Sequence, residues 1–363
     1  MSRIFVAGLG AVSPAGWNVA ALRAALDRGE PLPVQPLERP GGDKSLRARL
    51  VLAPATRPGF LAHPRLRRTS PITHYTAAAA LDAVAGLRAL RAEKIRLGLV
   101  VCQQAGCVHY SCRFFDEVLK DPATASPLLF PETVYAAPAS HVAALLENVT
   151  LANTLVGDPA SFLQGAALGI QWLEENTVDA CLIIGVEETN WILADALWHL
   201  DRPAVITGGA GAICLSLDPA LSIGVALETI TDVHSYRAST SRTQAAQAMR
   251  KQLPASSTVE LLCDGLSDSP RTDAAERAAW CDWTGPRLSP KRVLGEGLMA
   301  AAAWQCVAAC DLVSAGRFPA ANISLVGSNQ QAIGARFKQD GRNGHCPDSL
   351  SPPERGEGRG EGI

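Results

Sequence analysis

Alternation between two kinds of segment constrains the fold of this chain most strongly. Short runs such as LGLVVC at 97–102 and ACLIIGV at 180–186 are continuously apolar. Strands of this kind are buried on both sides, as in sheets that carry helices on each face. Alanine-rich segments of helical period, at 74–87 and 161–176, lie between or beside these runs. The alternation predicts a layered α/β protein.

The flanking sequence predicts further elements of the same kind. Residues 3–10 should form an opening strand, and residues 18–29 a helix that ends at Gly29. The runs at 211–217 and 224–230 should form a hairpin across the turn DPALS. The second half repeats the pattern, with a strand at 258–265, a helix from about Asp273, an alanine-rich helix that contains Cys306 and Cys310, and a last strand near 321–327.

Composition limits the classes of function. The chain has 363 residues, of which 47% are hydrophobic, enough for one large core or two fused half-cores. A formal net charge of −2 gives no footprint for nucleic acid or an anionic membrane surface. The absence of an apolar run of roughly 18 residues predicts no membrane span. A start without a signal-peptide core predicts a cytoplasmic protein.

Ten cysteines are scattered along the chain without the CxxC pairs of zinc sites. We therefore expect reduced, mostly buried thiols, no metal and no cofactor. From about residue 338 the sequence has almost no apolar residues and is rich in Gly, Pro, Glu and Arg. This composition predicts a disordered tail at 338–363.

Six segments carry recognisable motifs: VAGLGAVSPAG at 6–16, SPLLFPETVYAAPASHVA at 126–143, GGAGAICLSL at 208–217, LCDGLSDSPRTDAAE at 262–276, KRVLGEGLMAAAA at 291–303 and SLVGSNQQ at 324–331. Their order and spacing resemble those of the β-ketoacyl synthase (condensing enzyme) family, which has the thiolase fold. The resemblance covers the chain from residue 4 to about residue 337. It implies five layers, α/β/α/β/α, from two fused βαβαβ halves at 1–220 and 221–337.

The chemistry of that family needs four side chains. A cysteine at a helix N-terminus takes the acyl chain, and the helix dipole favours its thiolate. Two histidines stabilise the enolate that forms as a malonyl unit loses carbon dioxide, and a lysine supports the second histidine. The matching positions of this chain carry Pro159, Asp264 and Glu296 in place of the cysteine and the histidines, while Lys291 remains. Proline cannot act as a nucleophile, so the resemblance implies a subunit that is inactive by itself.

The loss of both histidines does not depend on the alignment. Between His234 and His345 the chain contains no histidine, and both family positions fall in this interval. His141 matches a histidine of the family's interface helix, where we interpret it as structural.

Each of these positions also has a simple structural interpretation. Lys291 and Glu296 can form an ion pair at a helix N-terminus, where a carboxylate is favourable. Asp264 can cap a strand end, or can be kept protonated. Ser161 is the one hydroxyl close to the lost nucleophile, but no His or Lys stands near it in sequence to serve as a base, so a helix N-cap is the better interpretation. Pro159 suits the first position of a helix.

These observations favour a non-catalytic subunit that resembles the chain-length factors. Such a subunit pairs as a heterodimer with an active ketosynthase, with an acyl carrier protein as a further partner, in polyketide or fatty-acyl chain extension. The loss of both histidines also resembles the degenerate subunit of aryl-polyene clusters. One alternative is an acyltransferase or condensing enzyme that uses Ser161 or a residue such as Cys107. The other is a homodimeric scaffold that binds an acyl carrier protein.

An apolar turn gives a prediction about the interface. In ketosynthase dimers the matching segment turns at the two-fold axis and reaches towards the partner's acyl pocket. Here it carries Leu128, Leu129 and Phe130 between Pro127 and Pro131. Exposed apolar turns are costly on a monomer and common at interfaces. We therefore expect Leu129 or a neighbour to reach the partner's tunnel.

Overall fold

The computed structural model describes residues 3–42, 45–90, 95–255, 257–328 and 330–341. Most strands belong to one mixed sheet in the order β12-β11-β13-β14-β9-β1-β8-β6-β4-β5, in which β10 pairs with β14. The N-terminal half of this sheet consists of β1 (Ile4–Val12), β4 (Leu97–Gln103), β5 (Val149–Val156), β6 (Ala180–Glu187) and β8 (Gly209–Ser216). The C-terminal half consists of β9 (Val225–Ile230), β10 (His234–Ser235), β11 (Leu261–Cys263), β12 (Arg287–Leu288), β13 (Ala320–Val326) and β14 (Gln331–Gln339).

The two halves of the sheet are joined by antiparallel pairing of β1 with β9. Within the N-terminal half, β4 runs parallel to β5 and β6, while β8 runs antiparallel to β6 and β1. Within the C-terminal half, β11 runs parallel to β12 and β13, and β14 runs antiparallel to β13 and β9. A separate small sheet contains β2 (Gln35–Leu37), β3 (Leu46–Arg49) and β7 (Ile206–Thr207).

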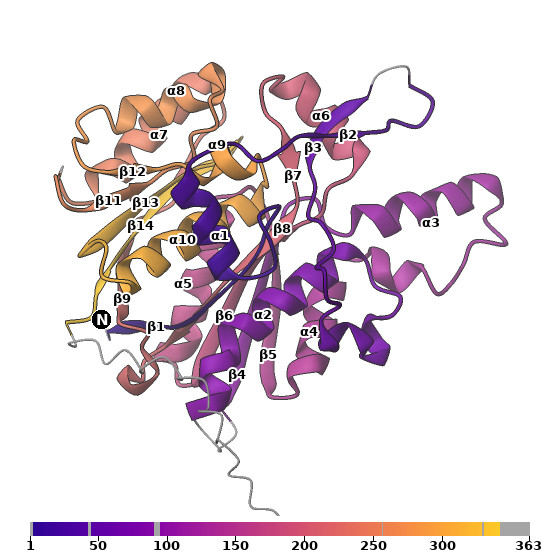
Figure 1. The fold of residues 1–363 in the computed structure, drawn as a ribbon, viewed down its shortest axis with the longest axis horizontal. Helices are drawn as coiled ribbons and strands as arrows, with labels where there is room; N and C mark the ends of the chain where they lie inside the picture. Colours follow the sequence, from indigo (N-terminus) through magenta and orange to yellow (C-terminus); the bar gives the residue numbers. More distant parts are fainter. Residues whose placement is uncertain (1–2, 43–44, 91–94, 256, 329, 342–363) are drawn as a thin grey trace, which may run out of the picture.

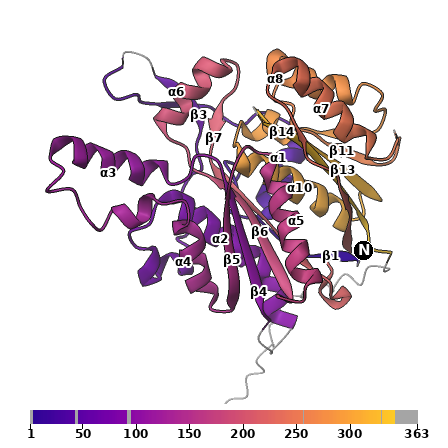
Figure 2. The ribbon, with the colours of Figure 1, turned by 180° about the vertical axis from the view of Figure 1, so that it is seen from behind.

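Helices complete five layers, α/β/α/β/α, as the sequence predicts (Figures 1 and 2). The outer face of the N-terminal half is covered by α2 (Pro71–Leu90) and α4 (Ala137–Leu146). Between the two halves lie α5 (Ser161–Glu174) and α10 (Met299–Ser314). The outer face of the C-terminal half is covered by α7 (Ser239–Lys251) and α8 (Pro270–Ala279).

Shorter or peripheral helices complete the chain: α1 (Val19–Arg28), α3 (Val108–Lys120), α6 (Trp191–Leu200), α9 (Pro290–Leu294) and the 3₁₀ turns η1 (Gly59–Ala62), η2 (Pro64–Leu66), η3 (Phe130–Thr133) and η4 (Pro219–Leu221). Across the described residues, no helix combines the length and the apolar character that a membrane crossing requires. The nine cysteines in this part of the chain are free thiols, and most of them are buried.

The pairing of two strands and the end of the ordered chain differ from the sequence prediction. The runs at 211–217 and 224–230 do not pair with each other, because β1 lies between β8 and β9 and pairs with both. The opening strand β1 therefore lies between the two strands that the sequence predicted to pair as a hairpin. The ordered chain also continues past residue 337, since Lys338 and Gln339 extend β14 and Asp340 is buried. The remainder of the predicted disordered tail, 342–363, lies outside the described residues.

The central helix α10 has no exposed face. Every residue from Met299 to Val313 is buried. The helix contacts β6 and β8 on one side and β13 and β14 on the other. Alanines dominate it because a helix between two sheets has room for small side chains on all faces.

Close approach between α10 and the sheet depends on two glycines. Gly185 of β6 and Gly211 of β8 are cross-strand partners, and Ala303 lies over both. A Cβ atom at Gly185 would lie 2.8 Å from the Ala303 Cβ, and one at Gly211 would lie 2.7 Å from it. Side chains at either position would force the helix away from the sheet.

We predict that Gly211→Ala lowers the free energy of unfolding by about 1–3 kcal/mol, because the added methyl overpacks the contact with α10. Urea unfolding followed by circular dichroism measures the change. Gly86→Ala is the matched control, since an added Cβ in α2 would have no neighbour within 4 Å. This control should be neutral or slightly stabilising. Equal stability of the Gly211→Ala variant and the wild type would contradict the packing argument.

Candidate functional site

The start of α5 is the position where the family nucleophile is expected. The helix begins at Ser161 with Ala160 as its N-cap, and no side chain caps it. Two structural interpretations from the sequence are therefore wrong: Ser161 is not the N-cap, and Pro159 is not the first helical residue. Instead the Asp158 carboxylate accepts from the backbone N–H of Ala160 at 3.2 Å. Asp158 thus stabilises the turn before α5, a role that the sequence analysis gave to Ser161 as a helix N-cap.

The Asp158 carboxylate also fills the space opposite this turn. Its Oδ2 accepts from the backbone N–H groups of Gln330 and Gln331 at 3.2 and 3.3 Å. A Cβ at Gly327 would lie 1.9 Å from this oxygen, so the carboxylate occupies the place of a side chain. Pro159 itself has no N–H to donate. The backbone donors that could polarise a carbonyl at this point are therefore missing or already engaged.

Among the described residues, the hydrogen-bond partner of the Ser161 hydroxyl is an amide and not a base. Its Oγ accepts from the Gln331 amide at 2.9 Å, and the residue is buried. A side-chain amide cannot take up a proton, so it cannot act as a general base for the hydroxyl. The arrangement holds the serine as part of the helix packing.

Cys107, the other fallback nucleophile, is poorly placed for reaction. Its thiol is buried at the end of the loop that precedes α3 and contacts the Val134 carbonyl at 3.7 Å. Burial, together with the nearby carboxylates of Glu188 and Glu132, raises the pKa of Cys107 to about 12. A thiol with a raised pKa is almost entirely protonated at neutral pH and is a weak nucleophile.

Asp264 belongs to a buried pair of carboxyl groups that the sequence did not reveal. It follows β11 and is fully buried, and its Oδ1 accepts from the Ser289 hydroxyl and from Leu266 N. Glu276, on α8, accepts from Gly265 N at 3.1 Å and is also buried. The motif LCDGLSDSPRTDAAE contains both residues, but only the structure shows that both carboxyl groups turn into the core.

Burial makes it costly for both groups to be charged. It raises the pKa of Glu276 to about 8, and the Asp264 carboxyl adds to this increase. Burial also raises the pKa of Asp264, while Ser289 and the guanidinium of Arg287, 3.5 Å away, oppose the increase. Burial thus favours the protonated form of Glu276. The pKa of Asp264 is raised in the same direction, so the protonated Asp264 that the sequence left as an alternative stays a prediction.

Lys291 and Glu296 form the ion pair that the sequence suggested. Lys291 Nζ lies 2.7 Å from Glu296 Oε2, and both side chains are largely covered, so the pair is not a solvated one. Glu296 does not begin the helix, because α10 starts at Met299. Its other oxygen accepts from Leu298 N at 2.8 Å, and this bond fixes the turn before α10.

The structure thus separates the family positions into two groups of contacts. Pro159 and Ser161 lie in the turn that Asp158 and Gln331 hold. Asp264 and Lys291 lie close together, because Asp264 binds Ser289 directly before α9. Within the described residues, no group of three or more His, Cys, Asp or Glu side chains could hold a metal ion. The charged groups here are engaged with one another or with the backbone.

The apolar turn at 128–130 is exposed only in part. Leu128 is 68% exposed and Phe130 is 56% exposed, but Leu129 is 7% exposed and packs inside its own chain. Of the residues that the sequence offered for contact with a partner, Leu129 is thus covered, and its neighbours Leu128 and Phe130 are exposed. The Phe130 ring lies 5.5 Å from the ring of Phe114 on α3, which joins the turn to that helix.

Several solved structures have the same architecture as this chain. A β-ketoacyl synthase from Burkholderia phymatum STM815 matches with a TM-score of 0.77 at 15% identity, over 93% of this chain and 100% of that one. The ishigamide ketosynthase/chain length factor matches with a TM-score of 0.78 at 17% identity, over 94% of this chain and 100% of that one.

The ketosynthase ApeO in complex with its chain length factor ApeC, from Xenorhabdus doucetiae, matches with a TM-score of 0.75 at 14% identity, over 93% of this chain and 98% of that one. The chain has the ketosynthase fold. No protein-family profile and no curated protein matches the sequence. The ketosynthase fold is therefore present at an identity too low to carry residue roles over by itself.

Glu276→Gln should remove part of the pH dependence of stability in this ketosynthase fold. A carboxyl with a raised pKa in the folded state stabilises the fold fully below its unfolded pKa, near 4.5 for Glu276, and this contribution is lost as the pH rises through about 8. Glutamine mimics the protonated form. Between these pH values the free energy of unfolding should fall more for the wild type than for the variant, by on the order of a few kcal/mol.

Chemical unfolding at a series of pH values tests this expectation. Glu187 is a second buried glutamate, and burial raises its pKa to about 8, so it contributes equally to both proteins and cancels in the comparison. Parallel stability profiles of the wild type and Glu276→Gln would show that Glu276 is ionised in the folded chain.

Proposed function

We propose that this chain is a ketosynthase-like subunit without condensing activity of its own, which pairs with an active ketosynthase in the manner of a chain length factor. The observation that carries the proposal is Pro159 in the turn that leads into α5. A residue with neither a nucleophilic side chain nor a backbone N–H stands where the acyl group would have to be bound. The neighbouring donors are engaged by Asp158.

The positions of the two family histidines support the same conclusion. Both positions carry a carboxyl group. Asp264 accepts from the Ser289 hydroxyl, and Glu296 forms an ion pair with Lys291. Stabilisation of an enolate needs hydrogen-bond donors or positive charge, and a carboxylate opposes it. Decarboxylation of a malonyl unit is therefore not a reaction that this arrangement favours.

The partners come from the solved complexes. Two of the similar structures are a ketosynthase/chain length factor and a ketosynthase in complex with its chain length factor. A third is a type II acyl carrier protein in complex with its ketosynthase. We propose the same two partners here, an active ketosynthase and an acyl carrier protein, in the cytoplasm. The absence of both histidines favours the aryl-polyene type of subunit within this class.

A basic surface suits the acyl carrier protein. No Asp or Glu occurs from residue 44 to residue 81, and this stretch contains several exposed arginines. Arg65, Arg67 and Arg68 follow one another around η2 and are all exposed. The phosphate of a phosphopantetheine arm is an anion that arginine binds well.

The enzyme alternative has weaker support. Ser161 contacts an amide instead of a base, and the thiol of Cys107 is buried with a raised pKa. The homodimeric scaffold would need the same interface to accept a second copy of this chain. The two experiments below separate these readings.

The chain by itself should give no condensation product from an acyl primer and malonyl-carrier protein. Co-expression with an active ketosynthase from a neighbouring gene should give a heterodimer that does form product, measured by mass spectrometry of the carrier. Replacement of the partner's catalytic cysteine by alanine, the control, should abolish product although this chain is intact. Turnover by the isolated chain that Ser161→Ala removes would establish the enzyme alternative.

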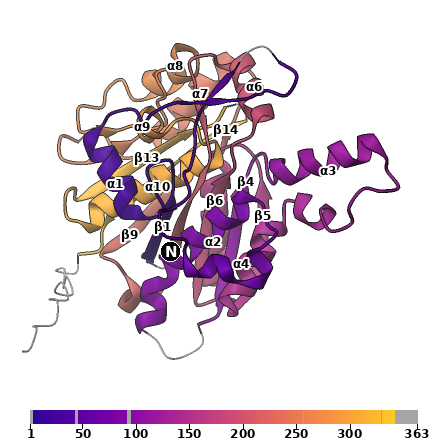
Figure 3. The same ribbon diagram turned by 45° about the vertical axis from the view of Figure 1, so that its right-hand side comes forward.

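The surface around α3 is the proposed ketosynthase interface. This helix projects from the body of the molecule together with the loop that follows it, and it contains no buried residue (Figures 1 and 3). It carries two large apolar side chains that are mostly exposed, Phe115 and Leu119, beside the exposed Leu128 and Phe130. Short helices without tertiary packing are marginal in water, so this one needs a covering surface.

An unpaired strand edge extends the same surface. β5 is the last strand in the order of the described sheet and pairs only with β4. Val156, at its end, is 54% exposed. Open edges of this kind pair with another strand or are covered by another chain. We propose that the edge of β5 and the arm formed by α3 and residues 126–135 both belong to the interface.

We predict that Leu128→Asp weakens assembly with the ketosynthase at least tenfold, because a carboxylate without a partner would be buried at the interface. Leu128→Trp should preserve assembly and shorten the product, since a larger side chain would fill the partner's tunnel. Size exclusion and product mass measure the two effects. Val259→Asp is the matched control, a charge at an equally exposed apolar residue in the C-terminal half. Normal assembly and unchanged product length in both Leu128 variants would exclude a role for this turn.

A further inference from the structure

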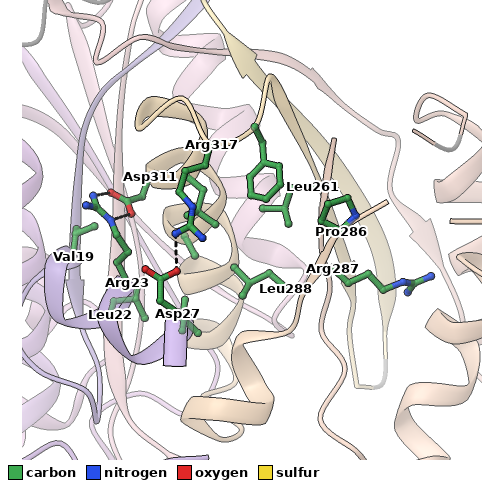
Figure 4. A pocket seen from close by; sticks show the side chains of 14 residues that line it. Val19, Leu22, Arg23, Asp27, Leu261, Pro286, Arg287, Leu288, Asp311 and Arg317 are labelled. Carbon is green, nitrogen blue, oxygen red and sulfur yellow. Dashed lines mark hydrogen bonds and ion pairs between the residues drawn. The ribbon is translucent and has the colours of Figure 1, made fainter. Parts of the chain in front are cut away.

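A cavity of about 170 Å³ opens between α1, α10 and β12 (Figure 4). Its floor is apolar, and the main contributors are Leu22, Leu26, Leu261, Leu288, Ala308 and Phe318. A cavity of roughly 150 Å³ can hold a benzene ring. The apolar body that fits here therefore has about six carbon atoms.

Charged side chains surround the apolar floor in two ion pairs. Arg23 binds Asp311 through two parallel hydrogen bonds, and Asp311 is nearly buried. Arg317 binds Asp27 through a single contact of 2.6 Å between Nη1 and Oδ1. Both partners of this second pair are about half exposed. The first pair is thus part of the wall, whereas the second is a weak pair that another group can replace.

The unused donor groups of one arginine favour an anion. Three arginines and two aspartates line the cavity, and two of the arginines form the ion pairs Arg23–Asp311 and Arg317–Asp27, whose charges balance. The Arg287 guanidinium turns away from the other four in Figure 4 and donates to the Trp280 carbonyl. Arg317 contacts Asp27 through Nη1 alone, so its other donor groups are not used by this aspartate. A carboxylate can meet a guanidinium with two parallel bonds, where Asp27 makes one.

We propose that this cavity is a binding site for a small monocarboxylate with an aliphatic body of about six carbons. The body lies on the leucines of α1 and β12, and the carboxylate replaces Asp27 on Arg317. The site is separate from the turn at Pro159 and from the arm at α3. It needs no partner chain, and it stands whether or not the chain pairs with a ketosynthase.

The cavity is also lined by β12, the strand whose backbone binds Asp264 of the buried carboxyl pair. Leu288, in its wall, accepts from Asp264 N at 2.9 Å through its backbone carbonyl. The stem of Arg287 lines the cavity while its guanidinium lies 3.5 Å from the Asp264 carboxylate. A bound ligand therefore contacts the strand whose backbone accepts from Asp264.

Isothermal titration of the full chain with hexanoate tests the proposal. We expect saturable binding with one ligand per chain. Acetate lacks the body, 1-hexanol lacks the charge and hexylamine carries the opposite charge, so each should bind at least tenfold more weakly. Absence of saturable hexanoate binding, or tighter binding of hexylamine, would overturn the assignment.

Two pairs of variants locate the site. Val19→Trp should block it, because Val19 is a partly exposed residue of the wall, whereas Ala20→Trp, on the exposed face of α1, should bind normally. Arg317→Gln should weaken hexanoate binding about tenfold, as expected for the loss of charge-assisted bonds. Asp27→Asn should tighten it about threefold by removing the competing carboxylate. Unchanged affinity in Val19→Trp, or equal effects of Arg317→Gln and Asp27→Asn, would show that hexanoate binds elsewhere.

Discussion

The structure depends on the packing of one helix between two halves of a sheet. Because α10 is buried on all sides, its side chains must be small where the strands lie close. Where the strands lie further away, larger side chains must fill the space. Gly185 and Gly211 accept Ala303 on one face, and the Trp304 indole fills the remaining space and donates to the carbonyls of Val12 and Ala210 at 3.0 Å. This contact fixes the distance between the halves, and with it the positions of the turns that lead into α5 and α10.

Those two turns are each held by a buried or largely covered carboxylate. Asp158 stabilises the first turn through bonds to Ala160, Gln330 and Gln331, and Glu296 stabilises the second through Lys291 and Leu298 N. In both cases a carboxylate satisfies backbone donors that would otherwise be buried without a partner. The residues at these turns therefore stabilise the fold itself. The turn before α5 does not need a nucleophile to keep its structure.

Much of this fold could be predicted from the sequence, because strands buried on both faces are continuously apolar and central helices are rich in alanine. The run at 180–186 became β6, and the alanine segment became α10. The hairpin expected at 211–230 failed for a topological reason. A turn signal between two strands does not show that a third strand, β1, inserts between them.

The candidate site was harder to predict, since its details depend on contacts between distant residues. The Lys291–Glu296 pair could be predicted from motif spacing alone. The assignment of Pro159 to the nucleophile position, made from the same spacing, stays a prediction. The role of Asp158 could not, because its partners Gln330 and Gln331 lie more than 170 residues away. Glu276 was missed because sequence does not show which carboxyl group of an acidic segment turns inward, and Leu129 because three apolar residues in a row do not reveal which one faces the core.

The position of β1 has a consequence for the synthesis of the chain. This strand is made first, but both of its neighbours, β8 and β9, begin only at Gly209 and Val225. At a translation rate of about 5–20 residues per second, β1 waits about 10–40 s for a strand to pair with. Throughout this interval its apolar residues and unpaired backbone groups are open to other chains on the same messenger. A nascent chain of this topology therefore carries an open strand for most of its synthesis, long before the central helix exists to close the core.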